Sequence, residues 1–259
     1  MKANWKMALM CVATLAFVAC GDPNKPSGGG GGGEEEEFKS KVSVTDNSID
    51  EWASLPAEYV VEAKCPADAA YLGLKSIKVY ADQLYINVLV EIDDLTITDR
   101  SWTPFHLYIN TDNSDKTGGY GDQYADANVD VMLEGAVFSD GEPCEFNPGV
   151  SNWYGEVGGT GWEWCPAGAA NDESDCWCAK VCAGDMPVGT SQCVNGKFEM
   201  QIMRELIPTE AGWNESEFGV GFDIQQNWST AGLLPQVSPT EENPNGLAKK
   251  MQIKIDMSK

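Results

Sequence analysis

Residues 77–90 read IKVYADQLYINVLV. On either side of Asp82-Gln83, apolar side chains occupy every second position, so each arm has one apolar face and one mixed face. This period of two is typical of strands that bury one face, and the polar pair between the arms is typical of a turn. The stretch therefore predicts a β-hairpin with one side against a hydrophobic core.

The same alternation recurs along the chain, and long helical stripes are missing. It is found in seven segments: 77–81, 84–91, 105–110, 129–134, 198–202, 218–224 and 251–255. Clusters of Gly, Pro, Asn and Asp separate them. Seven or more half-buried strands with such separators predict an all-β fold, namely an antiparallel β-sandwich of jelly-roll or immunoglobulin-like type.

The first 19 residues have the organisation of an export signal. A basic start is followed by an uncharged run from Met7 to Ala19, which is too short to span a bilayer. The sequence FVACG at residues 17–21 resembles the lipobox of bacterial lipoproteins, although Phe17 replaces the commoner Leu. The resemblance implies that Cys20 is lipidated and begins the mature chain. The alternative is an ordinary cleaved secretory signal in which this cysteine is incidental.

Residues 20–40 are predicted to form a flexible tether. They contain a run of glycines (28–33) followed by glutamates (34–37), and they lack any pattern that could bury a core. The segment resembles the export tethers of surface-displayed lipoproteins in the Bacteroides group. This resemblance implies a lipid-anchored, surface-exposed protein of the outer membrane, whose single folded domain occupies residues 41–259.

The composition of the chain limits its partners. The formal net charge of −23 argues against nucleic acid and against adsorption to anionic membranes, so membrane contact is expected through the lipid anchor only. Motifs such as G-x-S-x-G, H-E-x-x-H and the phosphate loop are missing. We expect no catalytic activity, although a glycoside hydrolase stays open because 40 acidic residues make any carboxylate pair unremarkable.

Cysteines concentrate in one long segment, about residues 136–195, which is predicted to be an insertion in the domain. In an oxidising exterior this even local set predicts disulfide staples. A thiolate metal site is the alternative, but the spacing lacks paired C-x2-C knuckles. Cys65 is left over, either as a buried thiol or as a disulfide partner. The six cysteines are Cys144, Cys165, Cys176, Cys178, Cys182 and Cys193.

Five short motifs follow one another along the chain: SIDEWASLP (48–56), IKVYADQLYI (77–86), LYINTDNSDKTGG (107–119), NVDV (128–131) and ELIP (205–208). In this order they resemble family 9 carbohydrate-binding modules and their DOMON-like relatives. The resemblance covers about residues 44–256 without the insertion, and it implies a carbohydrate-binding β-sandwich. The chain departs from the family pattern where Glu51 replaces a glycine and where Asn110 replaces the first aspartate of the loop.

The loop from residue 110 to 119 is a candidate calcium site. Alternating Asp, Asn and Ser side chains in a tight turn supply the oxygen ligands that this cation requires. The alternative is a polar turn whose side chains cap their own backbone, and both interpretations stay open. The candidate ligands are Asn110, Asp112, Ser114, Asp115 and Asp130.

Exposed aromatic side chains are candidates for stacking on sugar rings. The alternation places His106 and Tyr108 on one face of a strand, and Asp223 with Gln225 on one face of another. If these strands are neighbours, an amphipathic platform results. The candidate ligand-binding residues are Tyr108, Trp153, Tyr154, Trp162, Trp164, Trp177, Gln225 and Trp228. Trp52 and Trp213 are instead expected in the core, and the tryptophans of the insertion could also form a small core of their own.

These observations predict a non-catalytic surface lipoprotein that binds a polysaccharide or glycan near uptake machinery of the outer membrane. No haem is expected, because the single histidine, His106, comes without a haem motif. The alternative function is that of a structural or adhesive protein, which contacts a protein partner through the stapled insertion.

Overall fold

The computed structural model describes residues 38–258, apart from positions 45, 47, 68, 70, 94–95, 120, 122, 144–148, 154–155, 159–162, 165–195, 205–206, 208 and 210. For residues 139, 142–143, 149–152 and 163–164 only the backbone is described. The predicted lipidation site Cys20 and the tether up to residue 37 lie outside the described residues. None of the helices in the described part of the chain is long and apolar enough to cross a membrane.

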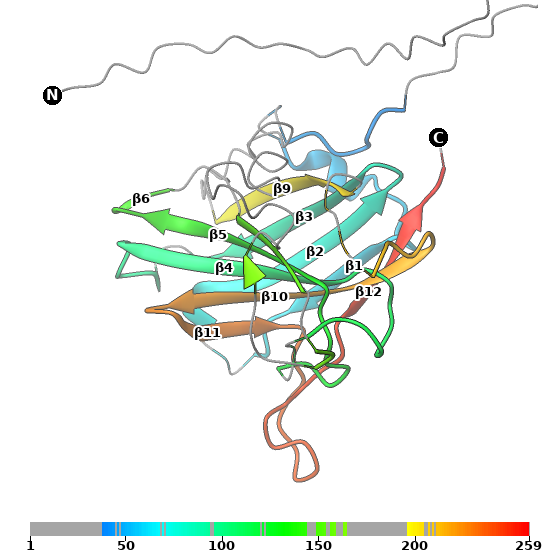
Figure 1. The fold of residues 1–259 in the computed structure, drawn as a ribbon. Helices are drawn as coiled ribbons and strands as arrows, with labels where there is room; N and C mark the ends of the chain where they lie inside the picture. The colour runs from blue at the N-terminus through cyan, green and yellow to red at the C-terminus, as the bar shows by residue number, and fades with distance from the viewer. Residues whose placement is uncertain are drawn as a thin grey trace, which may run out of the picture. The chain divides into compact units, whose positions relative to one another are not determined.

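Strands dominate the described chain, as the alternation predicts (Figure 1). Two short 3-10 helices accompany them, η1 (Asp50–Ala53) and η2 (Tyr71–Gly73). The strands are β1 (Val60–Lys64), β2 (Leu74–Asp82), β3 (Tyr85–Ile92), β4 (Trp102–Asn110), β5 (Val131–Ser139), β6 (Glu142–Pro143), β7 (Gly149–Asn152), β8 (Glu163–Trp164), β9 (Lys197–Met203), β10 (Glu217–Gln226), β11 (Ser229–Leu234) and β12 (Met251–Asp256).

The predicted hairpin of residues 77–90 is formed by β2 and β3, which pair antiparallel. At its turn Asp82 Oδ1 accepts hydrogen bonds from the backbone N–H groups of Leu84 (2.9 Å) and Tyr85 (2.7 Å). The aspartate thus caps the turn with its own carboxylate, a role in which Asp is favoured. All seven predicted segments overlap strands, although the segment 129–134 begins two residues before β5, so the alternation identified the main body of the sheet.

The described strands form one mixed sheet with the order β8-β7-β5-β4-β10-β12-β2-β3-β9, to which β1, β6 and β11 add as side branches. The purely antiparallel arrangement that we expected is wrong at one pair. Strand β12 runs antiparallel to β10 as far as Lys254, and then its last two residues pair in parallel with Ala81 and Asp82 of β2. This short parallel contact joins the two parts of the sheet.

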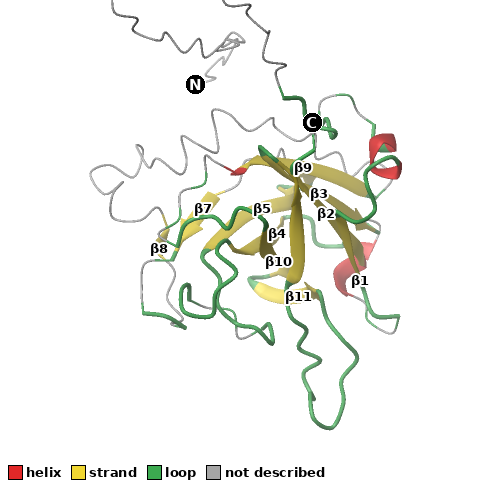
Figure 2. Cartoon of the chain, turned by 90° about the vertical axis from the view of Figure 1, so that its right-hand side faces the viewer, coloured by secondary structure: helices red, strands yellow, loops and turns green. Residues whose placement is uncertain are grey.

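The sheet curls so that β4, β5 and β10 face β2, β3 and β9 across one hydrophobic core (Figures 1 and 2). The ring of Phe105 on β4 lies 5.8 Å from that of Phe198 on β9 and 5.5 Å from that of Phe222 on β10. The inward positions of all six strands contribute Ile, Val, Leu, Met and Phe side chains that are almost fully buried. Their removal from water is the main favourable term in folding.

The predicted insertion begins within the sheet. Residues 136–139 are the end of β5, and β6, β7 and β8 extend the sheet from there. The six cysteines predicted to form staples lie outside the described residues: Cys144, Cys165, Cys176, Cys178, Cys182 and Cys193. Cys65 carries a free, half-buried thiol that donates to the carbonyls of Pro66 and Ala69, both at 3.4 Å. Burial raises the pKa of this thiol.

The outer face of β2, β3 and β9 is covered by the N-terminal segment, residues 38–55, and we call it the covered face. Val42, Trp52 and Leu55 of this segment pack against Tyr80 and Leu89 of the sheet, and all five side chains are buried. Trp52 is thus a core residue, as the sequence predicts. The segment that follows the tether is therefore part of the folded unit.

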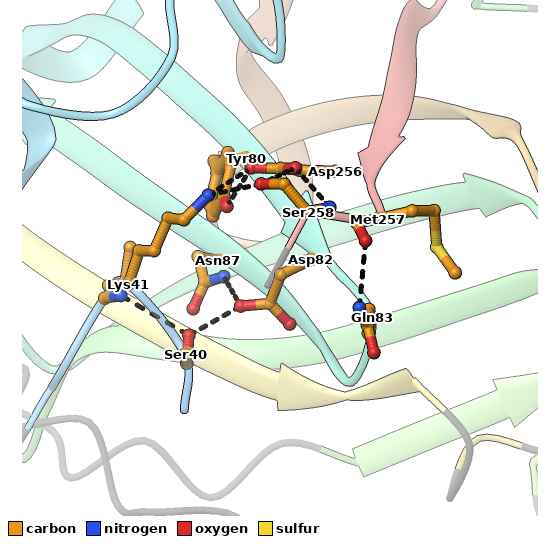
Figure 3. A network of polar contacts seen from close by, with 10 residues as sticks. Ser40, Lys41, Tyr80, Asp82, Gln83, Asn87, Asp256, Met257 and Ser258 are labelled. Atoms are coloured by element: carbon orange, nitrogen blue, oxygen red, sulfur yellow. Dashed lines mark hydrogen bonds and ion pairs between the residues drawn. The ribbon is translucent and has the colours of Figure 1, made fainter. Parts of the chain in front are cut away.

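Hydrogen bonds fasten this segment to the sheet and to the end of the chain (Figure 3). Ser40 Oγ donates to Asp82 at 2.6 Å, and Lys41 Nζ lies 2.7 Å from Oδ2 of Asp256, which also accepts from the Tyr80 hydroxyl at 2.8 Å. Burial by itself would raise the pKa of Asp256. The hydrogen bonds from Lys41, Ser258 and Tyr80 outweigh it and hold that pKa well below its usual range.

Glu199 is a buried carboxyl group beneath the covering segment. The indole Nε1–H of Trp52 donates a hydrogen bond to it. Burial raises the pKa of Glu199 to about 7; the Trp52 hydrogen bond opposes this shift, whereas the nearby charges of Glu51 and Asp46 add to it. The covered face therefore buries an acid that gains a proton readily on folding.

Candidate functional site

The candidate site lies on the opposite outer face of the sheet, on β4, β5, β10 and β11 (Figure 1). Strand β4 lies between β5 and β10, and His106 stands opposite Glu134 on one side and opposite Asp223 on the other. This confirms the condition set by the sequence, that the strands bearing His106 and Asp223 are neighbours. Their polar side chains therefore gather on one surface.

His106 forms hydrogen bonds with both flanking carboxylates. Its Nδ1 lies 2.8 Å from Oδ1 of Asp223, and its Nε2 lies 2.9 Å from Oε2 of Glu134. Burial by itself disfavours the charged ring, but the hydrogen bonds and charges of the two acids outweigh it and raise the pKa of His106 to about 9. At neutral pH the imidazolium donates from both nitrogens.

Asp223 is the centre of this polar cluster. Its Oδ1 accepts from the backbone N–H (3.1 Å) and the ring of His106. Its Oδ2 accepts from the Tyr108 hydroxyl (3.2 Å), Gln225 Nε2 (3.1 Å) and Thr230 Oγ1 (3.2 Å). A buried carboxylate with this many donors fixes the positions of the side chains around it. The surface is thus pre-organised by one aspartate.

Two tryptophans lie on the same face as the cluster: Trp228 at the turn between β10 and β11, and Trp102 at the start of β4. The ring of Trp228 lies 5.9 Å from that of Trp102, at an angle of 42°. Trp228 is 65% exposed, although tryptophan, as a large apolar residue, is normally buried to a large extent. Asn227 and Trp228 both have left-handed backbone angles (φ 51° and 62°), which are unfavourable for residues with a Cβ. An exposed indole held in a strained turn is suited to ligand contact.

We call the surface formed by these side chains the platform. It combines a charged cluster, an amide, a hydroxyl and two indole rings. Its members are Trp102, His106, Glu134, Asp223, Gln225, Trp228 and Thr230. Flat aromatic surface beside oriented hydrogen-bonding groups is the combination that sugar binding requires.

Beyond the platform, the same outer face is covered by residues 121 and 123–129, which we call the covering loop. The ring of Tyr124 lies directly on Gly221, where a Cβ would come within 2.2 Å of Tyr124 Cζ. Tyr108, Tyr124, Met132 and Leu233 form a buried cluster here. Tyr108 is only 2% exposed, so it is wrong to expect its ring at the surface for stacking. Its hydroxyl group instead donates a hydrogen bond to Asp223 from within the protein.

Lys250 fastens the covering loop. Its Nζ lies 3.0 Å from Oδ1 of Asp126, donates to the carbonyl of Ala127 and stands 5.5 Å above the Tyr124 ring. Burial lowers the pKa of Lys250, and the charge of Asp126 opposes the shift. The covering loop, which borders the platform, is therefore held in place by the ion pair of Lys250 with Asp126 as well as by the packing of Tyr124.

The predicted cation loop is closed by its own hydrogen bonds. Asp112 accepts from Ser114 N (2.9 Å) and Thr117 Oγ1 (2.8 Å), and Asn110 Nδ2 donates to the carbonyl of Ser114 (2.9 Å). The backbone carbonyl of Asp115 accepts a hydrogen bond from Asn128 Nδ2 at 2.6 Å. Asn110 Oδ1 is buried without a partner.

Asp130 stands at the base of this loop. Its Oδ2 accepts from the N–H of Thr111 (2.8 Å) and from Thr111 Oγ1 (3.2 Å). Burial raises the pKa of Asp130 to about 6. The hydrogen bonds from Thr111 oppose this shift, whereas the negative charge of Asp112 adds to it. Among the described residues, no three His, Cys, Asp or Glu side chains form a group that could hold a metal ion. These contacts match the self-capped alternative, and calcium stays a prediction.

Trp153 lies away from the platform. It is 8% exposed, its Nε1 donates to the carbonyl of Glu156 at 3.1 Å, and its ring lies on Gly119, where a Cβ would be 2.0 Å away. The prediction of an exposed stacking ring is therefore wrong for Trp153. Together with Lys116 and Asp130 it lines a separate cleft of about 200 Å³.

The remaining predicted ligand residues fall into two groups. Gln225 and Trp228 are on the platform. Tyr154, Trp162 and Trp177 lie outside the described residues, and Trp164 is described only by its backbone in β8. Trp102, Glu134 and Thr230 belong to the platform, but the sequence did not single them out as ligand residues. Alternation places Glu134 on the outer face of its strand, yet only the strand order brings it to His106.

The chain matches no family model and no curated protein sequence. Any function assigned to it therefore rests on the residues themselves and on the geometry of the platform.

Proposed function

We propose that this protein is a non-catalytic carbohydrate-binding lipoprotein, which holds a polysaccharide or glycan on its platform at the surface of the outer membrane. The observation that carries the proposal is the exposed ring of Trp228, which packs against the half-buried ring of Trp102 on the same face as the polar cluster centred on Asp223. Indole rings stack on the C–H faces of sugars, and the amide, hydroxyl and carboxylate groups next to them can orient sugar hydroxyls.

The architecture is consistent with this function. Two parts of the curled sheet enclose one core, and among the described strands the short pairing of β12 with β2 joins them. We interpret this as a β-sandwich of the kind found in family 9 carbohydrate-binding modules, which the five sequence motifs resemble. In this interpretation, the sheet of β4, β5 and β10 supplies the binding face.

The N-terminal segment leaves the platform uncovered, which also supports the proposal. Residues 38–55 lie on the covered face, which is the outer surface on the other side of the core from the platform. A flexible tether would then leave the platform free to sample large ligands.

The geometry of the acids favours binding over hydrolysis. Glycosidases use two carboxyl groups with room for the substrate between them. On the platform the imidazole of His106 lies between Glu134 and Asp223 and bonds to both. Both carboxylates therefore bind the histidine, which fills the space between them that a substrate would need. We propose binding without catalysis for this reason.

The test is affinity electrophoresis of the purified full-length protein through gels that contain hydroxyethyl cellulose, xylan, mannan or glycol chitosan. We expect at least one polysaccharide to retard the protein. W228A is expected to lower the affinity measured from the retardation about fivefold, because stacking of one ring is worth roughly 1 kcal/mol. M257A is the matched control, since Met257 is also a large exposed apolar side chain (59%) but lies on the C-terminal segment, away from the platform.

Retardation of the wild type by none of these polysaccharides would overturn the proposal. Equal loss of retardation in the Trp228 and Met257 variants would also overturn it, because it would show that the platform is not the contact.

A further inference from the structure

The platform carries an unbalanced negative charge. Its three ionisable groups are the carboxylates of Asp223 and Glu134 and the imidazolium of His106 between them. Two negative charges are thus met by one positive charge. The chain as a whole, at −23, adds to the negative potential rather than relieving it.

The excess charge is accessible at Glu134. Asp223 is almost fully buried and saturated by donors, whereas the Glu134 side chain is 24% exposed. Glu134 bonds to His106 through Oε2, and among the described residues its Oε1 accepts no hydrogen bond. A carboxylate oxygen at the edge of the cluster is therefore available to a donor from outside.

Aromatic surface lies on the same face. Trp102 precedes His106 by four residues on β4, roughly 13 Å along an extended strand, and the Trp228 ring packs against it. The face of an indole attracts cations through its quadrupole, and a carboxylate binds an ammonium group by a charge-assisted hydrogen bond. Both parts of the platform therefore favour a ligand that carries positive charge on a flat, apolar ring.

We propose that the glycan bound by the platform contains amino sugars with a free, protonated amine, and that Glu134 selects them. This inference rests on the proposed function, because it names the class of glycan that the same platform binds. A glycan rich in uronic acid or sulfate is repelled by the same charge. A neutral glycan stacks on the indoles but brings no positive charge to Oε1 of Glu134.

The experiment compares three soluble oligosaccharides of equal length that share one β-1,4 backbone. Cello-oligosaccharide carries a hydroxyl at C2, chito-oligosaccharide an acetamide, and chitosan oligosaccharide a free amine. Affinities of the full-length protein are measured by titration calorimetry in weakly acidic buffer, at low and at high salt. We expect chitosan to bind roughly two- to fivefold more tightly than cello-oligosaccharide at low salt, and this preference to shrink at high salt.

Two variants separate selection by Glu134 from general attraction to an acidic protein. E134Q keeps an acceptor for His106 and removes the charge, and we expect the preference for chitosan to fall close to one. E58Q removes a charge from an exposed residue between η1 and β1, outside the platform, and we expect the preference to remain.

The outcomes distinguish the two proposals. If none of the three oligosaccharides and no polysaccharide binds, the proposed function fails. If the three bind with equal affinity, or if E58Q lowers the preference as much as E134Q, carbohydrate binding stands and selection of amino sugars by Glu134 is overturned.

Discussion

The two outer faces of the curled sheet carry similar side chains but differ in what lies on them. On the covered face, Trp52 of the N-terminal segment packs against the sheet and donates a hydrogen bond to the buried Glu199. On the platform, Trp228 is exposed, and Glu134 presents part of its carboxylate to solvent. Because the chain covers one face with its own residues, a tryptophan and an acid there contribute to stability. On the other face the same residue types remain available to a ligand.

The largest expected difference between the faces is in the stability effect of their tryptophans. Trp52→Ala removes a buried ring and should lower the free energy of unfolding by about 3–5 kcal/mol. Trp228→Ala removes an exposed ring and should change it by less than about 0.5 kcal/mol. Urea denaturation measures both values. Similar losses in the two variants would break the comparison.

One titrating group on each face should make the free energy of unfolding depend on pH, and the two groups should act in different pH ranges. Glu199 has its pKa raised from 4.5 to about 7 on folding, and His106 from 6.5 to about 9. Both groups bind protons more tightly in the folded state, so stability falls as pH rises. The Glu199 contribution is complete below its unfolded pKa and lost by about pH 7. The His106 contribution is complete below its unfolded pKa and lost as pH rises through about 9.

Each contribution should amount to about 1–3 kcal/mol. Denaturant unfolding from acid to alkaline pH tests this with E199Q, which should flatten only the lower window, and H106Q, which should flatten only the upper one. An E199Q profile that parallels the wild type between the two pKa values of Glu199 would contradict this part of the account.

Removing the ion pair that holds the N-terminal segment should lower the free energy of unfolding by a smaller amount. Lys41→Met removes the cation that lies 2.7 Å from the buried carboxylate of Asp256, and we expect a loss of about 1–2 kcal/mol. Lys197→Met is the matched control, because its pairing with Glu91 spans 3.5 Å between exposed side chains and is worth less than about 0.5 kcal/mol. Equal effects on thermal melting would show that the segment is held by packing alone.

The smallest expected effect concerns divalent cations at the 110–119 loop. Asp112 and Asp130 already accept hydrogen bonds from the loop itself, so a chelator should move the melting temperature by less than about 1 °C. Differential scanning calorimetry with and without chelator measures the shift. A decrease of several degrees, reversed by added calcium, would show a working calcium site there.

The sequence predicts the strands well because their alternation is local. Ile77, Val79 and Ala81 face the core, and the turn at Asp82 is capped by that residue, as the pattern of polar and apolar side chains suggests. The order of strands depends instead on contacts far apart in sequence. The parallel contact of β12 with β2 therefore has no local signal.

The candidate site was predictable only in part for the same reason. Alternation places His106, Glu134 and Asp223 on the outward faces of their strands, but only the strand order makes His106 bridge the two acids. Burial of Tyr108 depends on Tyr124, which a loop brings over it from another part of the chain. The pairing of Trp102 with Trp228 likewise requires β4 and β10 to be neighbours.

The most direct test of the account is hydroxyl-radical footprinting, read by mass spectrometry, in the presence and absence of a polysaccharide that retards the protein. Trp228 on the platform and Met257 on the C-terminal segment are both exposed and reactive in the free protein. We predict that bound glycan protects Trp228 from oxidation and leaves Met257 unchanged. Oxidation of Trp228 that is undiminished when the glycan is bound would contradict the claim that the platform is the binding face.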